Sequence, residues 1–279
     1  MSNKVVAFAN QKGGVGKTTS CVNIAASLAA LGSKILLIDL DPQGNATMGS
    51  GINKNKLTWT MNEVLQGEVG IQEALQQNTP GGYAVLPANG DLTAAEVALL
   101  RKPKQENILT NSLQSIQDGF DFILIDCPPS LNMLTLNAFV AADAVIIPMQ
   151  CEYYALEGLS ALMQTIEQVK VSLNPRLKIE GIIRTMYDPR NRLSTEVSAQ
   201  LISHFGNGVY QTVIPRNVRL AEAPSHGLPV SLYDKSSKGS EAYFSLAKEI
   251  LAQRKQAESA KRSKAAGAIK SRTPVTTET

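Results

Sequence analysis

The sequence predicts an α/β fold, a doubly wound and mostly parallel sheet with helices on both faces. Apolar runs of β-forming residues alternate with helical stretches along the chain. Several of these runs are almost continuously apolar, which is typical of strands buried on both faces. At 279 residues and 43% hydrophobic content, the chain has the length and composition of a single globular domain. The expected strands are 5–9, 35–39, 83–87, 122–126, 144–148, 179–185 and 208–214, and the expected helices are 18–31, 60–66, 94–100, 106–117, 156–173, 195–205 and 239–253.

A glycine-rich loop separates the first strand from the first helix. Its glycines allow backbone N–H groups to approach phosphate oxygens, and the helix N-terminus adds a positive dipole end. Lys17 can reach the β- and γ-phosphates, and the Thr18 hydroxyl can ligate Mg²⁺. Gln11 stands where the usual P-loop has its first glycine, and Lys12 follows it. The sequence therefore predicts a P-loop that binds a nucleoside triphosphate through Lys12, Gly13, Gly14, Val15, Gly16, Lys17, Thr18 and Thr19.

Lys12 distinguishes this loop from most P-loops. It is similar to the signature lysine of the deviant Walker A class, in which this residue reaches phosphates held by a partner subunit. A charge supplied across the interface makes dimerisation depend on nucleotide, because two facing triphosphates repel each other unless cations lie between them. We therefore expect Lys12 to act in an ATP-dependent homodimer.

Two carboxylates follow the second strand. Ligands of open α/β sheets bind beyond the carboxyl ends of the strands, so Asp39 and Asp41 should lie beside the P-loop. Asp41 can orient or deprotonate a water for in-line attack on the γ-phosphate, and Asp39 can influence the metal shell. The segment from Asp41 to Asn45 also reads as a turn, which is compatible with the catalytic role.

The fourth expected strand ends in an acid. Four apolar residues precede Asp126, and Pro128 and Pro129 then prevent the strand from continuing. After a P-loop, this pattern is a Walker B element, whose aspartate holds Mg²⁺ through a water. We expect ATP and Mg²⁺ as cofactors, with Thr18, Asp126 and Asp39 around the metal.

The C-terminal 28 residues differ from the rest of the chain. We expect a P-loop ATPase domain over residues 1–251 and a basic tail over 252–279. The tail holds seven basic and two acidic residues, and its Ala, Ser, Lys and Thr content favours disorder or a frayed extension of the last helix. It either adds nonspecific attraction to nucleic acid or serves only solubility. It lacks the bulky apolar face of a membrane anchor, so we expect no membrane partner.

The N-terminus and the cysteines limit the function classes further. The first strand begins almost at once, so we expect neither a signal peptide nor an N-terminal DNA-reading domain. No apolar run approaches the ~20 residues of a membrane span. Cys21, Cys127 and Cys151 are scattered singly, which favours reduced thiols of a cytosolic protein over a metal site or disulfides.

Five motifs together closely resemble the ParA/Soj family of partition ATPases. Three are those described above: the loop from Lys12, the stretch 39–45, and the stretch from Asp126 to Ser130. The other two are 151–159 and 213–227, and the likeness covers roughly residues 3 to 250. The resemblance implies that Lys12 acts in trans and that Asp41 serves hydrolysis. It also places Pro215, Arg216 and Asn217 beside the adenine base.

The resemblance implies a switch. ATP would support a face-to-face dimer that binds nonspecific double-stranded DNA, and a ParB-type centromere-binding protein would stimulate hydrolysis that is slow without it. Arg190 and Arg219 lie where short family members carry DNA-binding arginines, so we expect them to contact phosphates only when two subunits pair. The implied location is the cytoplasm, on the nucleoid.

Four alternatives share the loop or the fold. A related ATPase could position a protein cargo on the nucleoid, and the sequence barely separates this function from chromosome partition. A MinD-like membrane-surface regulator would need an apolar face on the C-terminal helix. An iron–sulfur reductase would need cysteines placed for a shared cluster. Small-molecule synthetases share the fold, but the stretches 151–159 and 213–227 favour the partition family.

Overall fold

The structure is a computed structural model that describes residues 4–270, with side chains described for residues 4–260. A six-stranded sheet, parallel at every pairing, runs through the described region in the order β3-β2-β4-β1-β5-β6. The predicted α/β class is confirmed. The strands are β1 (Lys4–Phe8), β2 (Ile35–Asp39), β3 (Ala84–Leu86), β4 (Phe122–Asp126), β5 (Ala144–Gln150) and β6 (Lys178–Thr185).

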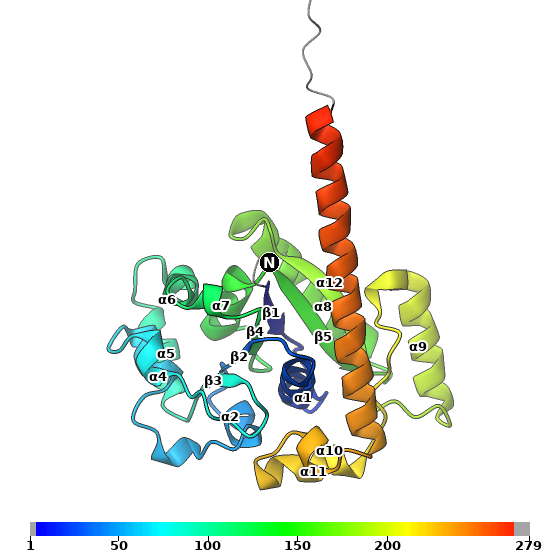
Figure 1. Ribbon diagram of the computed structural model, residues 1–279, viewed down its shortest axis with the longest axis horizontal. Helices are drawn as coiled ribbons and strands as arrows, with labels where there is room; N and C mark the ends of the chain where they lie inside the picture. The colour runs from blue at the N-terminus through cyan, green and yellow to red at the C-terminus, as the bar shows by residue number, and fades with distance from the viewer. Residues whose placement is uncertain (1–3, 271–279) are drawn as a thin grey trace, which may run out of the picture.

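Helices cover both faces of this sheet (Figure 1). One face packs against α1 (Lys17–Ala30) and α12 (Lys238–Lys270). The other face carries α3 (Met61–Gln66), α5 (Leu92–Leu99), α6 (Ile108–Leu113), α7 (Met133–Ala141) and α8 (Ala155–Ser172). The remaining α-helices of the described chain are α2 (Asn45–Gly49), α4 (Ile71–Ala74), α9 (Arg192–Phe205), α10 (Val218–Glu222) and α11 (Val230–Tyr233).

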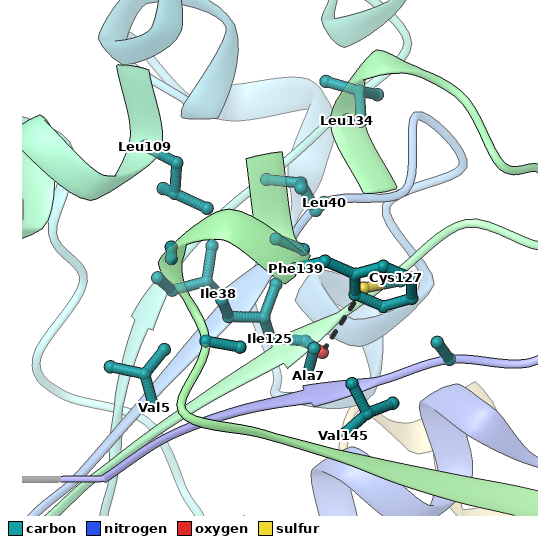
Figure 2. Close-up of a cluster of buried hydrophobic side chains, with 14 of the residues drawn as sticks. Val5, Ala7, Ile38, Leu40, Leu109, Ile125, Cys127, Leu134, Phe139 and Val145 are labelled. Carbon is teal, nitrogen blue, oxygen red and sulfur yellow. Dashed lines mark hydrogen bonds between the residues drawn. The ribbon is translucent and has the colours of Figure 1, made fainter. Parts of the chain in front are cut away.

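The two cores explain why the strands are continuously apolar. Leu36 and Ile38 of β2 belong to the core on the α7 side, whereas Leu37 between them belongs to the core on the α1 side. Successive strand residues point to opposite faces, so a sheet covered twice needs apolar side chains at every position. Figure 2 shows part of the α7-side core, where Phe139 lies over the central strands and beside Cys127.

The centre of the sheet positions the site. β1 and β4 are neighbours, but the connection after β1 leads to β2 on one side and the connection after β4 leads to β5 on the other. Their carboxyl ends therefore form a topological switch point, where open α/β sheets bind ligands. In the register of the ladders, Asp126 pairs with Phe8 of β1 and with Asp39 of β2.

The predicted strand at 208–214 is wrong. The segment joins β6 only at its ends, through Tyr210 N to Ile182 O and Ile214 N to Arg184 O. Between these points side chains take the backbone groups: the Arg184 guanidinium donates to the carbonyls of Tyr210 and Gln211, and the Glu249 carboxylate accepts from the N–H groups of Gln211 and Thr212. A ladder needs those same groups.

Other element boundaries also differ from the prediction. The expected helix 106–117 is reduced to α6, with 3-10 turns at Gln105–Asn107 and Gln117–Gly119. Helix α7 was not predicted, because its residues are mostly apolar and show no clear helical periodicity.

Helix α3 begins with a capping box. Thr60 caps the helix, and Glu63 accepts from the Thr60 N–H at 2.7 Å.

Helix α12 is longer than the predicted helix 239–253. It crosses the expected boundary between residues 251 and 252 without a break and runs to Lys270, well beyond the body of the molecule (Figure 1). Residues 252–270 therefore continue α12, which corresponds to the second alternative expected for the tail, an extension of the last helix. Arg254 anchors the extension by donating to Asp121 O and lying over the Phe122 ring. Residues 271–279 of the predicted tail lie outside the described residues.

Candidate functional site

The P-loop has the strand–loop–helix arrangement that the sequence predicts. It leaves the end of β1 and enters α1, with Gly14 and Gly16 at φ 73° and 83°. These values lie in the left-handed region, where a side chain would be strained. Thr185 at the end of β6 holds the loop from outside, because its hydroxyl donates to Val15 O at 2.8 Å.

A pocket of about 300 Å³ lies over this loop. Its walls combine the P-loop with three further segments, which contribute Asp41, Pro129 and Met186. Pro129 follows β4, and Met186 follows β6 at a φ of 49°. The complete lining is Gly13, Gly14, Gly16, Lys17, Thr18, Thr19, Asp41, Gln43, Asn45, Pro129 and Met186. The pocket thus brings six of the predicted loop and helix residues together with Asp41. Of the other residues predicted to bind phosphate or metal, Lys12, Val15, Asp39 and Asp126 do not line it.

Lys17 lies buried at the base of this pocket. Its ammonium donates to Lys12 O at 3.2 Å. Burial lowers the pKa of Lys17, and the nearby carboxylate of Asp126 opposes that shift. A buried ammonium is costly without anionic partners, so Lys17 favours a ligand that carries a strong negative charge.

Thr18 and Asp126 form the centre of the site. The Thr18 hydroxyl donates to Asp126 Oδ2 at 2.7 Å, while the buried Oδ1 has no hydrogen-bond partner within the described chain. Burial, followed by the charge of Asp39, raises the pKa of Asp126 well above its ordinary value. A hydroxyl beside a carboxylate with one free oxygen provides the hard oxygen ligands that Mg²⁺ prefers, so these residues fit the ion.

The two acids after β2 have different surroundings. Asp39 is fully buried, and its carboxylate accepts from the Thr47 N–H and hydroxyl and from the Asp41 N–H. These bonds anchor the start of α2 beside the pocket. Burial raises the pKa of Asp39 to about 6 despite those hydrogen bonds. Because its oxygens already serve local structure, the predicted influence of Asp39 on a metal shell would be indirect.

Asp41 lies in the pocket wall with 8% of its surface exposed. Its carboxylate accepts from the Gln43 N–H at 2.9 Å, and its carbonyl accepts from the Gly44 N–H. The predicted turn is therefore present. Asp41 lines the same pocket as Lys17 and Thr18, and its hydrolytic role stays a prediction.

Lys12 points away from the loop's own pocket. Its ammonium forms an ion pair with Glu152, which lies between β5 and α8, and both side chains are roughly half exposed. Lys12 thus lies at the protein surface, near the edge of the sheet where the strands β1 and β5 end.

A second pocket, of about 200 Å³, adjoins the first and shares Gly16, Thr19 and Met186 with it. Pro215, Arg216 and Asn217, predicted to lie beside the base, all line it. Asn217 Oδ1 is buried beside Gly239 without a hydrogen-bond partner in the described chain. Once the side chain turns toward the pocket, this oxygen can accept from an exocyclic amino group such as that of adenine. The two pockets therefore adjoin, with the P-loop in one and the segment predicted to lie beside the base in the other.

Several residues of this site were not predicted from the sequence. Thr185, Met186 and Tyr243 line the second pocket or hold its wall, and the Tyr243 hydroxyl is hydrogen-bonded to Ser20 at 3.0 Å. For Thr185 and Met186 the sequence holds one signal, which is the apolar strand that ends beside them. Tyr243 gave no signal, because nothing near it in the sequence distinguishes it from a core residue.

Arg190 and Arg219 lie on two neighbouring segments at the rim. Tyr187 N donates to Ile214 O at 2.9 Å, and Arg216 N donates to Tyr187 O, so the chain after β6 runs beside the 214–216 segment. Arg190 forms an ion pair with Asp188, and Arg219 forms ion pairs with Glu222 and Asp234. The structure thus brings the segments that carry both predicted DNA-binding arginines together.

Comparison with known proteins decides the family. Residues 3–179 match the family model described as an AAA domain. The chromosome partitioning protein ParA of Caulobacter vibrioides is 50% identical over 250 residues, which are 89% of this chain and 94% of the relative. The chain belongs to the ParA/Soj family of chromosome-partitioning ATPases. The sporulation initiation inhibitor Soj of Bacillus subtilis, 48% identical over 249 residues, covers 89% of this chain and 98% of its own length.

A solved structure supports the nucleotide site of this ParA/Soj chain. It is described as cobyrinic acid a,c-diamide synthase from Mycobacterium smegmatis with bound ATP analog and magnesium. It has a TM-score of 0.80 and 39% identity, and the match covers 91% of this chain and 96% of the other. The family resemblance predicted from the motifs is confirmed. No described helix of the chain is both long and apolar enough to cross a bilayer.

Proposed function

We propose that the chain is an ATP-dependent dimerising switch. As an ATP-bound dimer it would bind nonspecific double-stranded DNA, and it would hydrolyse ATP to drive segregation of a chromosome or plasmid with a ParB-type partner. Family membership supports the ATPase activity, and the geometry of the site supports the coupling between nucleotide and DNA.

The observation that supports this proposal most directly is that two neighbouring segments line the nucleotide pockets and also carry the two arginines expected to bind DNA. Met186, Pro215 and Arg216 line the nucleotide pockets. The same two segments continue to Arg190 and Arg219, and backbone hydrogen bonds hold them together. A nucleotide that fills the pockets touches the base of the surface that would meet DNA. Nucleotide state can therefore set the positions of both arginines.

The chain's own residues account for the steps of the cycle. Lys17 and the P-loop N–H groups would hold the phosphates, while Thr18 and Asp126 would hold Mg²⁺, which neutralises phosphate charge when bound. Asn217 would accept from the adenine amino group. Lys12 would exchange Glu152 for the phosphates of a second subunit. Asp41 would position the attacking water, and loss of the γ-phosphate would release the interface.

The resemblance also supports the expected partners and place of action. A switch of this kind needs slow hydrolysis when alone, so that the DNA-bound state persists until a ParB-type protein stimulates turnover. Dimeric DNA binding places the protein on the nucleoid in the cytoplasm. Phosphate contacts by two paired surfaces carry no sequence preference, which suits a matrix rather than an operator.

The test is binding to a random-sequence duplex with ATP and Mg²⁺, with ADP, and without nucleotide. We expect binding with ATP alone, and Arg219→Glu should reduce it while leaving dimerisation intact. Sedimentation of the same samples provides the control for dimer formation. Equal binding in all three nucleotide states, or none in any of them, would refute the switch.

A further inference from the structure

The two arginines expected to meet DNA are already occupied by carboxylates. Arg190 Nε and Nη2 donate to the two oxygens of Asp188 at 2.9 and 2.8 Å, and the Arg190 N–H donates to Oδ1 at 3.0 Å. The Arg190 side chain is 88% exposed, so this bidentate pair lies at the surface. A guanidinium uses the same two-pronged geometry to bind phosphate.

Arg219 is held in a related way. Its Nη1 lies 2.7 Å from Glu222 Oε2, and its Nε lies 3.3 Å from Asp234 Oδ2. The Tyr233 hydroxyl also donates to Glu222 Oε2, at 3.1 Å, which fixes that carboxylate in place. Hydrogen bonds from the arginines lower the pKa of Asp188 to about 2 and also lower the pKa of Glu222. Both acids are therefore ionised at neutral pH.

We propose that Asp188 and Glu222 are built-in competitors of DNA phosphate for Arg190 and Arg219. The inference rests on the proposed DNA-binding function and adds the residues that limit its strength. Each carboxylate takes guanidinium N–H groups that could otherwise bind phosphate, so phosphate and carboxylate compete for the same arginine. The competitors keep the affinity of each subunit low, and useful binding then requires the paired surface of a dimer.

Removal of Asp188 and removal of Glu222 should free their arginines to different extents. The structure records one carboxylate on Arg190 and two on Arg219. Removing the charge of Asp188 leaves Arg190 without a competing carboxylate within the described chain, whereas Arg219 keeps Asp234 after loss of Glu222. Exposed ion pairs are weak, so release of one arginine should raise DNA affinity by roughly two- to fivefold. Asp188→Asn should therefore have the larger effect.

Loss of any acid near DNA also raises affinity through long-range attraction, and a double-mutant cycle separates the two causes. DNA affinity is measured with ATP and Mg²⁺ for the full chain, Asp188→Asn, Arg190→Gln and the double variant. Asp188→Asn keeps the oxygen that accepts from the Arg190 N–H, which preserves the local turn. Glu241→Gln is the matched control, because Glu241 is exposed and has no arginine partner in the described chain.

We expect Asp188→Asn to raise affinity in the full chain and to lose most of that gain when Arg190 is Gln. Glu241→Gln should change affinity much less. An equal gain with and without Arg190, or no gain from Asp188→Asn while the parent binds DNA, would overturn the competitor role and leave the proposed function standing. Absence of DNA binding in every variant would instead overturn the proposed function, and the competitor role with it.

Discussion

Thr18 and Asp126 are joined by a 2.7 Å hydrogen bond between the first turn of α1 and the last residue of β4. The bond leaves Asp126 Oδ1 buried and unpartnered within the described chain. A buried carboxylate oxygen without a partner is costly, and a bound cation with its water shell would supply the missing interaction. This relationship links the P-loop directly to the predicted metal site.

Asp126→Asn should remove the effect of Mg²⁺ on nucleotide binding. In the parent chain we expect ATP to bind more tightly with Mg²⁺ than with EDTA. The amide has no charge to hold the ion, so the two affinities should converge in the variant. Calorimetric titration with and without Mg²⁺ measures this. A preserved Mg²⁺ effect in the folded variant would remove Asp126 from the metal site.

Lys17→Ala should abolish measurable nucleotide binding. Each lost charge-assisted hydrogen bond to phosphate costs about 1.5–3 kcal/mol, which is roughly 10- to 150-fold in affinity. Binding of a fluorescent ATP analogue provides the measurement. Lys34→Ala is the control, because Lys34 is exposed at the start of β2, at the opposite end of the strand from the pocket. Unchanged affinity in Lys17→Ala would refute the P-loop assignment.

Lys12→Ala should separate nucleotide binding from dimerisation. The Lys12 ammonium contacts Glu152 and not the pocket of its own loop, so we expect ATP affinity to change little. Without the cation at the interface, facing phosphates would repel, and sedimentation with ATP and Mg²⁺ should show a monomer. A stable ATP-dependent dimer of this variant would show that Lys12 does not act across the interface.

Asp41→Ala should prolong the ATP-bound state. Loss of a positioned base typically slows the chemical step by about 100- to 10,000-fold, so phosphate release should fall by that order. The DNA-bound dimer should then persist for longer after ATP is added. Single-turnover hydrolysis and the dissociation rate from DNA are the two measurements. Hydrolysis at the parent rate would exclude Asp41 from the mechanism.

Because of Asp39, the free energy of unfolding of the ligand-free protein should decrease as the pH rises from about 4 to about 6. Its pKa is raised to about 6 by burial, against about 3.9 in an unfolded chain. The folded state then binds the proton more tightly, so this contribution is complete below pH 4 and is lost as the pH rises through 6. Urea unfolding at several pH values should show a smaller decline for Asp39→Asn. The same decline of unfolding free energy with pH in the parent and in Asp39→Asn would contradict this role of Asp39.

The sequence predicted the central part of the site because its residues are contiguous. A strand, a glycine loop and a helix follow one another within about 25 residues, so sequence order alone places Lys17 and Thr18 together at the end of that loop, where both line one pocket. Asp39 and Asp126 could be placed near them because parallel strands end at the same edge. The wrong strand at 208–214 shows the limit, since its backbone groups are taken by Arg184 and Glu249, and neither bond is visible in the local pattern.

The sequence by itself determined the fold class, the P-loop and the two acidic strand ends, because strand periodicity and loop chemistry act over short stretches of chain. Only the tertiary structure added Thr185, Met186 and Tyr243 to the wall of the second pocket and decided the partners of the exposed cations. The Thr185 hydroxyl reaches Val15 from 170 residues away, and Lys12 meets Glu152 across 140 residues. Such contacts depend on how six strands are ordered in one sheet, which no local pattern encodes.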